Sequence, residues 1–121
     1  MIEHISAVTF AVQDMTRSIE FYRLLGFALI YGGNDAAFST LKSGEAFVNL
    51  IASQGYQPRW WGRVILRVDN VDEHHRTLQA RGLTIPAPQD ASWGERFFHI
   101  TDPDGHEISF AQPLPAASSR R

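Results

Sequence analysis

The sequence predicts an α+β fold built from two tandem βαβββ modules. Short apolar, β-branched segments typical of strands alternate with two amphipathic segments typical of helices. The order strand, helix and three strands occurs twice along the chain, and equivalent positions of the two copies, such as Val12 and Val68, lie 56 residues apart. A constant offset of this kind indicates an internal repeat.

The first module begins with an apolar strand at residues 7–12. Asp14 follows it as a suitable N-cap, because its carboxylate can accept hydrogen bonds from the first free N–H groups of a helix at residues 15–25. Gly26 is placed to end that helix, since glycine adopts a left-handed conformation at little cost. Three strands are expected next, at residues 27–31, 36–41 and 46–52, with turn-forming residues between them.

The second module repeats this pattern, starting with a strand at residues 63–68. Asn70 is the expected N-cap of its helix, and Glu73, three positions on, completes a capping box. The helix is expected at residues 71–81, with Gly82 as its stop. Three strands should follow, at residues 83–85, 96–101 and 107–111.

The two modules together predict a single domain. A module of about 55 residues with one helix can cover only one face of a four-stranded sheet. Side by side, the two sheets would form one curved, cup-shaped mixed sheet with the helices on its convex side. We expect this domain to span residues 1–113, with modules at about 5–53 and 61–113 and a flexible tail at 114–121.

The composition indicates a globular protein and excludes several kinds of chemistry. Of the 121 residues, 44% are hydrophobic and 20% charged, and none is cysteine, which excludes disulfides, iron–sulfur clusters and thiol catalysis. The net charge of -2 argues against nucleic acid and membrane surfaces as partners. The sequence has no long apolar run and no visible secretory signal, so a cytoplasmic location is expected.

Four segments carry a resemblance to a known family: residues 8–15, 18–27, 93–98 and 102–108. They include an FYxxLGF motif that begins at Phe21 and an Asp-Pro-Asp-Gly turn that begins at Asp102. Together they resemble the glyoxalase, bleomycin-resistance and extradiol-dioxygenase superfamily, the vicinal oxygen chelate proteins. The resemblance covers residues 5 to about 113 and implies paired βαβββ modules. It leaves the function open, because this fold hosts many chemistries.

The Asp-Pro-Asp-Gly turn holds two acids, which suggests catalysis, but a structural role explains them better. Proline presets the turn, glycine supplies a positive φ, and the Asp side chains accept hydrogen bonds from nearby N–H groups. Phe21 and Tyr22 are likewise expected to pack the first helix against the sheet.

The resemblance also implies a divalent metal in the family's enzymes, held by residues of the first and fourth strands of each module. These positions fall on Ala7, Asn49, Arg63 and Ser109. Alanine has no donor atom, arginine stays cationic, and the other two offer weak neutral oxygens, whereas a first-row metal needs His or carboxylate ligands. We therefore expect no metal at this site and no cofactor.

One alternative hypothesis keeps a metal by relocating its ligands. Alternation along the strands puts Glu107 on the same face as Ser109, and Glu45 on the same face as Asn49. A histidine would complete the set, and the candidates are His4, His99 and His106. On this hypothesis the protein is a metal-dependent lyase, isomerase or dioxygenase.

The preferred hypothesis uses the concave face of the sheet to bind a ligand. Alternation points Arg63 and Arg67 into the cup, where they either pair with Glu107 or Glu45 or recognise a carboxylate of the ligand. The three tryptophans lie near loop–strand junctions, where their rings either stack on a planar ligand or pack at a dimer interface. The predicted ligand-binding residues are Phe47, Asn49, Trp60, Trp61, Arg63, Ile65, Arg67, Trp93 and Ser109.

Together with the resemblance, these residues predict a small-molecule-binding protein of the glyoxalase and bleomycin-resistance type, which sequesters an aromatic antibiotic or metabolite without chemical change. The resemblance to metal-free bleomycin-resistance proteins implies a homodimer with drug-binding crevices between its subunits. Those proteins carry a Trp-Gly element in a place like that of Trp93 and Gly94. They favour cationic glycopeptides in an acidic crevice, a character that Arg63 and Arg67 do not provide.

Overall fold

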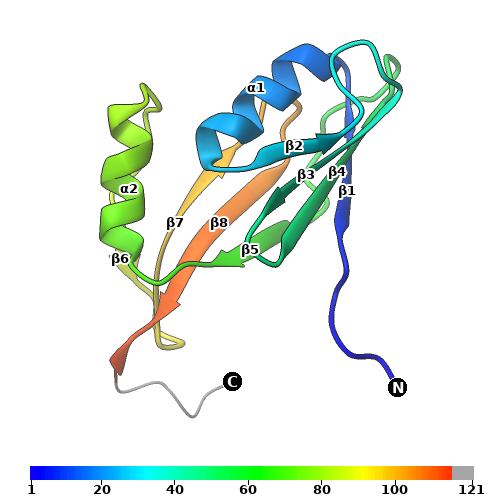
Figure 1. Cartoon of the computed structure of the whole chain (residues 1–121). Coiled ribbons are helices and arrows are strands. Elements are labelled where there is room, and N and C mark those ends of the chain that lie inside the picture. Colours follow the sequence, from blue (N-terminus) through cyan, green and yellow to red (C-terminus); the bar gives the residue numbers. More distant parts are fainter. Residues whose placement is uncertain (116–121) are drawn as a thin grey trace. The chain divides into compact units, whose positions relative to one another are not determined.

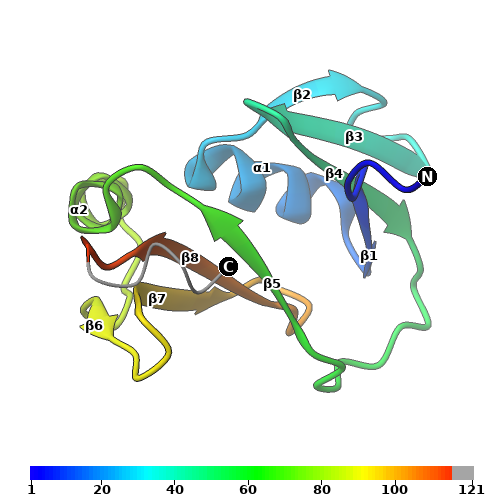
Figure 2. The same cartoon turned by 90° about the horizontal axis from the view of Figure 1, so that it is seen from below.

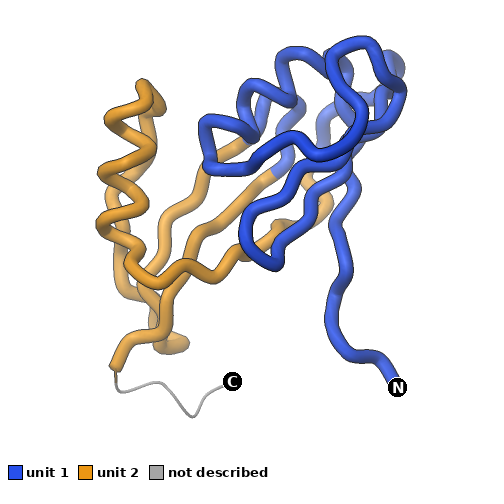
Figure 3. The backbone as a smooth tube through the Cα atoms, in the orientation of Figure 1, with its two compact units in different colours: residues 1–59, 102–106 blue, residues 60–101, 107–121 orange. Residues whose placement is uncertain are grey.

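The computed structural model of the chain, drawn in Figure 1, describes residues 1–115. These residues divide into two compact units, coloured separately in Figure 3. Unit 1 comprises Met1–Arg59 together with Asp102–His106, and unit 2 begins with Trp60–Thr101 and resumes at Glu107. Each unit holds one helix and one four-stranded sheet, so the predicted α+β fold with two βαβββ modules is confirmed.

The sheet of unit 1 has the strand order β1-β4-β3-β2. Its strands are β1 (Val8–Val12), β2 (Ala28–Tyr31), β3 (Phe38–Ser43) and β4 (Ala46–Ala52). β1 runs parallel to β4 and the other neighbours are antiparallel, so the sheet is mixed. Helix α1 (Met15–Leu25) lies on one face of this sheet, as Figure 2 shows, and leaves the other face without a helix.

Helix α1 begins and ends as its flanking residues predict. The Asp14 carboxylate accepts a hydrogen bond from the Arg17 N–H at 3.1 Å, and Gly26 ends the helix with a left-handed φ of 115°. Tyr22 is buried on the sheet side of the helix, where its ring lies 5.7 Å from that of Phe10. The predicted helix-to-sheet packing of Tyr22 is therefore confirmed.

The Asp-Pro-Asp-Gly turn belongs to unit 1, although the strands that it joins belong to unit 2. Asp104 is fully buried and accepts hydrogen bonds from the Gln13 N–H at 2.9 Å and the Ser18 hydroxyl at 3.3 Å. Asp102 accepts one from the Tyr22 hydroxyl at 2.7 Å. Burial raises the pKa of the Asp102 carboxyl, and burial together with the Asp102 charge raises the pKa of Tyr22. The two acids thus have the structural role expected of them.

The sheet of unit 2 has the equivalent strand order β5-β8-β7-β6. Its strands are β5 (Arg63–Arg67), β6 (Gln89–Asp90), β7 (Glu95–Thr101) and β8 (Glu107–Pro113). β5 runs parallel to β8, and the other pairs are antiparallel. Helix α2 (Val71–Ala80) packs on β7 and β8, with the His75 ring 5.1 Å from that of Phe98 and the His74 ring 4.6 Å from that of Phe110.

The prediction of a strand at residues 83–85 is wrong, because the structure forms no strand there. The Ile85 carbonyl instead accepts a hydrogen bond from the side chain of His75, at 3.2 Å from its Nε2. Pro86 and Pro88 have no N–H groups to donate to a neighbouring strand. The outer strand of unit 2 is therefore the two-residue β6.

The last described residues remain attached to unit 2. The Leu114 N–H donates a hydrogen bond to the Gly94 carbonyl at 2.9 Å. Residues 116–121, which make up most of the expected tail, lie outside the described residues. Within residues 1–115, no helix has both the length and the apolar character needed to cross a membrane.

Candidate functional site

In each unit, most of the predicted site residues lie on the sheet face that is turned away from the helix. Side chains alternate along a strand, so the neighbours of buried, helix-facing residues point to this open face. In β4 the helix-facing residues are Val48 and Leu50, and in β8 they are Ile108 and Phe110. The open face of unit 2, as the term is used below, consists of Arg63, Ile65, Arg67, Glu95, Phe97, His99, Glu107, Ser109 and Ala111.

On the open face of unit 1, Asn49 is held between two threonines. Its Oδ1 accepts a hydrogen bond from the Thr40 hydroxyl at 2.7 Å, and its Nδ2 donates to Thr9 Oγ1 at 3.2 Å. The register of β1, β4 and β3 places these three residues side by side. Phe47 lies on the same face, with the Lys42 ammonium 5.2 Å from its ring centre. The amide of Asn49 is thus already engaged within unit 1.

The open face of unit 2 carries a row of three rings. Trp93 stacks on Phe97 with ring centres 5.8 Å apart and planes inclined by 26°, and the His99 ring follows 5.4 Å beyond Phe97. The Trp93 indole N–H donates to a carboxylate oxygen of Glu95 at 2.9 Å. Glu95 is only 5% exposed, whereas Trp93 remains 44% exposed. The indole is therefore fixed at two points and still presents surface to a ligand.

The polar groups of this face differ in how far they are already engaged. Arg63 forms an ion pair with Glu107, its neighbour across the parallel strands β5 and β8. The Ser109 hydroxyl and His99 Nδ1 lie 3.3 Å apart and share a hydrogen bond. Arg67, at the other end of β5, is exposed, and within residues 1–115 its side chain forms no ion pair or hydrogen bond.

The predicted ligand-binding residues fall into three groups. The largest is on the open face of unit 2 or stacked on it, and consists of Arg63, Ile65, Arg67, Ser109 and Trp93. The second is on the open face of unit 1 and consists of Phe47 and Asn49. The third is exposed in the segment that precedes β5 and consists of Trp60 and Trp61.

The three members of the unit 2 face that lie on β7 were not predicted as ligand-binding residues: Glu95, Phe97 and His99. Counted from Trp93, they recur at every second position, which is the period of a strand face. That signal was hidden because the strand was expected to begin at residue 96, after Trp93 and Glu95. Cross-strand partners such as Glu107 for Arg63 depend on register, which alternation within one strand does not specify.

The open faces do not provide the donor set that a first-row divalent metal needs. Of the four positions that the resemblance implies, Ala7 has no donor atom and Arg63 is cationic. Asn49 and Ser109 are already hydrogen-bonded within their units. The carboxylate of Glu107, the main relocated candidate, is paired with Arg63. Within residues 1–115, no three His, Asp or Glu side chains gather closely enough to hold a metal ion. The residues present therefore do not fit such a metal.

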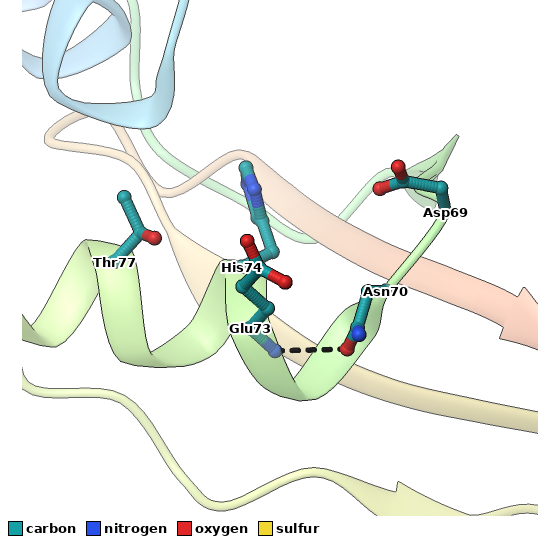
Figure 4. A pocket seen from close by; sticks show the side chains of 5 residues that line it. All are labelled: Asp69, Asn70, Glu73, His74 and Thr77. Atoms are coloured by element: carbon teal, nitrogen blue, oxygen red, sulfur yellow. Dashed lines mark hydrogen bonds between the residues drawn. The ribbon is translucent and has the colours of Figure 1, made fainter.

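A separate pocket lies at the N-terminal end of α2 and is shown in Figure 4. It is lined by Asp69, Asn70, Glu73, His74 and Thr77. Asn70 Oδ1 accepts the Glu73 N–H at 3.0 Å, which confirms the predicted N-cap. The volume is about 90 Å³, well below the roughly 300 Å³ at the lower end of small-molecule sites. The pocket contains none of the predicted ligand-binding residues and is too small for an aromatic drug.

The family follows from a comparison of the whole sequence. A sequence model described as the Glyoxalase/Bleomycin resistance protein/Dioxygenase superfamily matches residues 2–110. The chain belongs to this superfamily. The resemblance expected from the motif at Phe21 and the turn at Asp102 is therefore confirmed.

Individual members of the superfamily match nearly the whole chain. The bleomycin resistance protein of Geobacillus stearothermophilus is 27% identical over an alignment of 134 positions, gaps included, that covers 94% of this chain and 98% of the relative. A bleomycin-binding protein, solved as a complex with bleomycin, is 25% identical with a TM-score of 0.79, and the match covers 91% of this chain and 98% of that one. A bleomycin resistance determinant encoded on the transposon Tn5 has the same TM-score and coverage at 26% identity.

Proposed function

We propose that the protein binds a flat, partly aromatic small molecule and sequesters it without chemical change, and that the open face of unit 2 together with Trp93 is its binding surface. The relatives support a binding role, because they include a bleomycin resistance protein and a protein solved in complex with bleomycin. An antibiotic or a related aromatic metabolite is the proposed ligand class.

The observation that carries this proposal is the fixed, exposed ring of Trp93. Its indole N–H is held by Glu95 at 2.9 Å and its ring stacks on Phe97 at 5.8 Å, so little mobility remains to be lost on binding. Ordering a mobile side chain would otherwise cost about 0.5–1.5 kcal/mol. A planar ligand that covers the indole gains about 0.5–1.5 kcal/mol from stacking and about 25 cal/mol for each Å² of apolar surface buried.

Neighbouring residues supply the rest of the proposed contact surface. Micromolar affinity corresponds to about -8.2 kcal/mol, which one ring contact cannot provide. Ile65 is exposed on the same face and offers further apolar surface, and the half-buried ring of His99, which is hydrogen-bonded to the buried Ser109, offers a polar atom to orient the ligand. Four predicted residues lie outside this face and are proposed to contribute less to binding: Phe47, Asn49, Trp60 and Trp61.

The donor set favours sequestration over metal-dependent catalysis. A lyase, isomerase or dioxygenase of the superfamily type would need free carboxylates or histidines gathered around one point. Here Glu107 is paired with Arg63, and Asn49 is bonded to two threonines. We therefore assign the open face of unit 2 to binding rather than to a reaction.

A calorimetric titration with bleomycin and a panel of aromatic antibiotics tests this proposal. We expect at least one saturable ligand, which mass spectrometry should recover unchanged after incubation. Trp93→Ala should lower the affinity for that ligand about tenfold, which corresponds to 1.4 kcal/mol of binding free energy. Tyr31→Ala, which removes a 66% exposed ring from unit 1, should leave the affinity unaltered. No saturable ligand, a chemically altered ligand, or full affinity in Trp93→Ala would contradict the proposal.

We also propose that the protein is a homodimer. Large apolar side chains outside the proposed binding surface are exposed in unit 1, including Ile30, Phe38 and Ile51. Apolar surface of this kind can mark an interface, and a two-fold homodimer is the commonest assembly that covers it. Sedimentation at micromolar concentration should give twice the 13.6 kDa of one chain. A mass of one chain would contradict the dimer and leave the binding proposal intact.

A further inference from the structure

We propose that the molecule held by the open face of unit 2 is an anion: a planar aromatic carboxylate whose charged group binds Arg67 and whose ring lies on Trp93 and Phe97. This inference rests on the proposed function, since it names the class of ligand for the same surface. It is carried by three features of the described residues: the charge balance of the face, the register of its strands, and the hydrogen bonds already made by its polar groups.

The charge balance leaves Arg67 as the available cation. Its neighbour on β5, Arg63, is neutralised by Glu107, so two arginines that look equivalent in the sequence are not equivalent in the structure. The other acid of this face, Glu95, is 5% exposed and accepts the indole N–H of Trp93. Within residues 1–115, no acid pairs with Arg67. An incoming ligand therefore meets one unpaired positive charge and no unpaired exposed negative charge among the residues of this face.

Asp69 is the nearest acid in sequence to Arg67, and it does not neutralise it. It lies two positions further along the chain, where it lines the pocket at the N-terminal end of α2 (Figure 4). The described residues contain no ion pair between Asp69 and Arg67. The guanidinium consequently stays available to an anion from outside the chain.

The register of the strands places this charge at a suitable distance from the rings. Arg67 on β5, Ala111 on β8 and Phe97 on β7 are successive partners across the sheet. Neighbouring strands lie about 4.8 Å apart, so the backbones of Arg67 and Phe97 are about 10 Å apart. Ala111, which lies between them, contributes only a methyl group and is 2% exposed, so a ligand at this point would rest on the longer side chains beside it. A molecule of one or two fused rings that bears a carboxylate can therefore lie across β8 and reach both sides.

Among the other polar groups of the face, His99 keeps only its Nε2 outside the hydrogen bonds found within residues 1–115, and that atom can donate one bond at most. The Trp93 indole N–H is donated to Glu95, and the Ser109 hydroxyl is bonded to His99. A guanidinium matches a carboxylate with two parallel hydrogen bonds, which makes the contact strong and directional. A cationic ring system would bring its charge against Arg67 and lose affinity.

Three probes that share one ring system isolate the effect of charge: 2-naphthoate, 2-naphthamide and 2-naphthylmethylamine, which are anionic, neutral and cationic at neutral pH. Calorimetric titration of the full chain should rank their affinities in that order. We expect 2-naphthoate to bind about tenfold more tightly than 2-naphthamide, a difference of 1.4 kcal/mol. Equal affinities, or tighter binding of the amine, would overturn the inference.

Variants assign the charge effect to one residue. Arg67→Gln should remove the tenfold advantage of 2-naphthoate and leave 2-naphthamide unaffected, while Arg67→Lys should keep part of the advantage. Arg76→Gln is the matched control, because it removes the same charge from an exposed position on α2, the helix that covers the other face of this sheet. An advantage that persists in Arg67→Gln would overturn the inference. Circular dichroism of each variant verifies that it is folded.

Trp93→Ala separates failure of this inference from failure of the proposed function. If the three probes bind equally and Trp93→Ala weakens them all, the aromatic surface is correct and the anion preference is wrong. If neither the probes nor bleomycin binds saturably, the proposed function itself is wrong, and the inference fails with it. If 2-naphthoate is preferred and depends on both Trp93 and Arg67, both proposals are supported.

Discussion

Glu95 determines how the Trp93 ring is held on the open face of unit 2. Glu95 is 5% exposed and its carboxylate accepts the indole N–H at 2.9 Å, while the Phe97 ring stacks on one side of the indole. A hydrogen bond to a charged group contributes about 1.5–3 kcal/mol. Without it, the indole would be free to leave Phe97, and the surface that it offers to a ligand would no longer be fixed.

Glu95 variants test this role at the scale of one residue. We expect Glu95→Ala to lower the free energy of unfolding by about 2 kcal/mol and to weaken 2-naphthoate binding, because the indole loses its acceptor. Glu95→Gln keeps an acceptor oxygen and should preserve most of both quantities. Urea unfolding followed by circular dichroism measures the first and calorimetry the second. A loss as large in Glu95→Gln as in Glu95→Ala would contradict the assigned role.

His74 makes the stability of the protein depend on pH. Burial, followed by the charge of Arg81, holds the pKa of His74 below its ordinary value of 6.5, against the opposing charge of Asp69. The unfolded chain therefore takes up a proton that the folded chain resists. The stabilising contribution is complete above pH 6.5 and is lost as the pH falls below that value. The buried Nε2 of His74 has no hydrogen-bond partner within residues 1–115.

Replacing His74 should flatten this pH dependence. We expect the free energy of unfolding to fall between about pH 7 and pH 5.5, and His74→Phe to remove much of that fall. Phenylalanine keeps the ring contacts with Phe98 and Phe110 and does not titrate. His4→Gln, at an exposed position, is the control and should retain the dependence of the parent protein. Urea unfolding at a series of pH values provides the measurement, and an unaltered fall in His74→Phe would refute the assignment.

At the scale of elements, residues close in sequence predict where the helices begin and end. Which segments form strands depends also on contacts with residues far away in the sequence. Asp14 and Gly26 act within a few residues of α1, so the sequence contains the whole signal. The expected strand at 83–85 failed because Pro86 and the hydrogen bond to Ile85 compete with strand pairing. Tertiary context of this kind cannot be read from a short apolar run.

The candidate site was predictable to the extent that it depends on alternation. The period of two correctly assigned Arg63, Ile65 and Arg67 to one face of their strand. It could not distinguish Arg63 from Arg67, because the partner of Arg63 lies 44 positions away on another strand. Which of the two arginines is paired with an acid therefore depends on how the strands pair, and it can be stated only once their register is known.

The Asp-Pro-Asp-Gly turn should be a main source of stability at this scale. Asp104→Ala leaves the Gln13 N–H and the Ser18 hydroxyl without their acceptor, and an unsatisfied buried group costs about 1–3 kcal/mol. We expect a loss of about 3 kcal/mol in the free energy of unfolding. Asp35→Ala, at an exposed position between β2 and β3, should change it by less than about 0.5 kcal/mol. Chemical denaturation measures both, and a loss below about 1 kcal/mol in Asp104→Ala would contradict the prediction.

At the scale of the whole molecule, the chain has the fold for which the resemblance implies a metal site in the family's enzymes. The residues that it carries at those positions do not fit a metal. We predict that protein purified without chelator contains far less than one nickel, zinc, iron or manganese ion per chain, because Asn49, Ser109 and Glu107 are engaged by other side chains. Elemental analysis provides the measurement. Stoichiometric metal that is lost in Glu107→Gln and retained in the control Glu3→Gln would instead support a relocated metal site.

The location of the bound ligand can be observed directly by NMR titration of ¹⁵N-labelled protein with 2-naphthoate. The three tryptophans give three indole signals, of which Trp93 lies on the proposed surface, while Trp60 and Trp61 precede β5. We predict that the Trp93 indole and the amides of β5, β7 and β8 shift in a saturable way, with smaller changes elsewhere. Shifts confined to unit 1 or to the pocket of α2, or a Trp93 indole signal that stays in place at saturation, would contradict binding on the open face of unit 2.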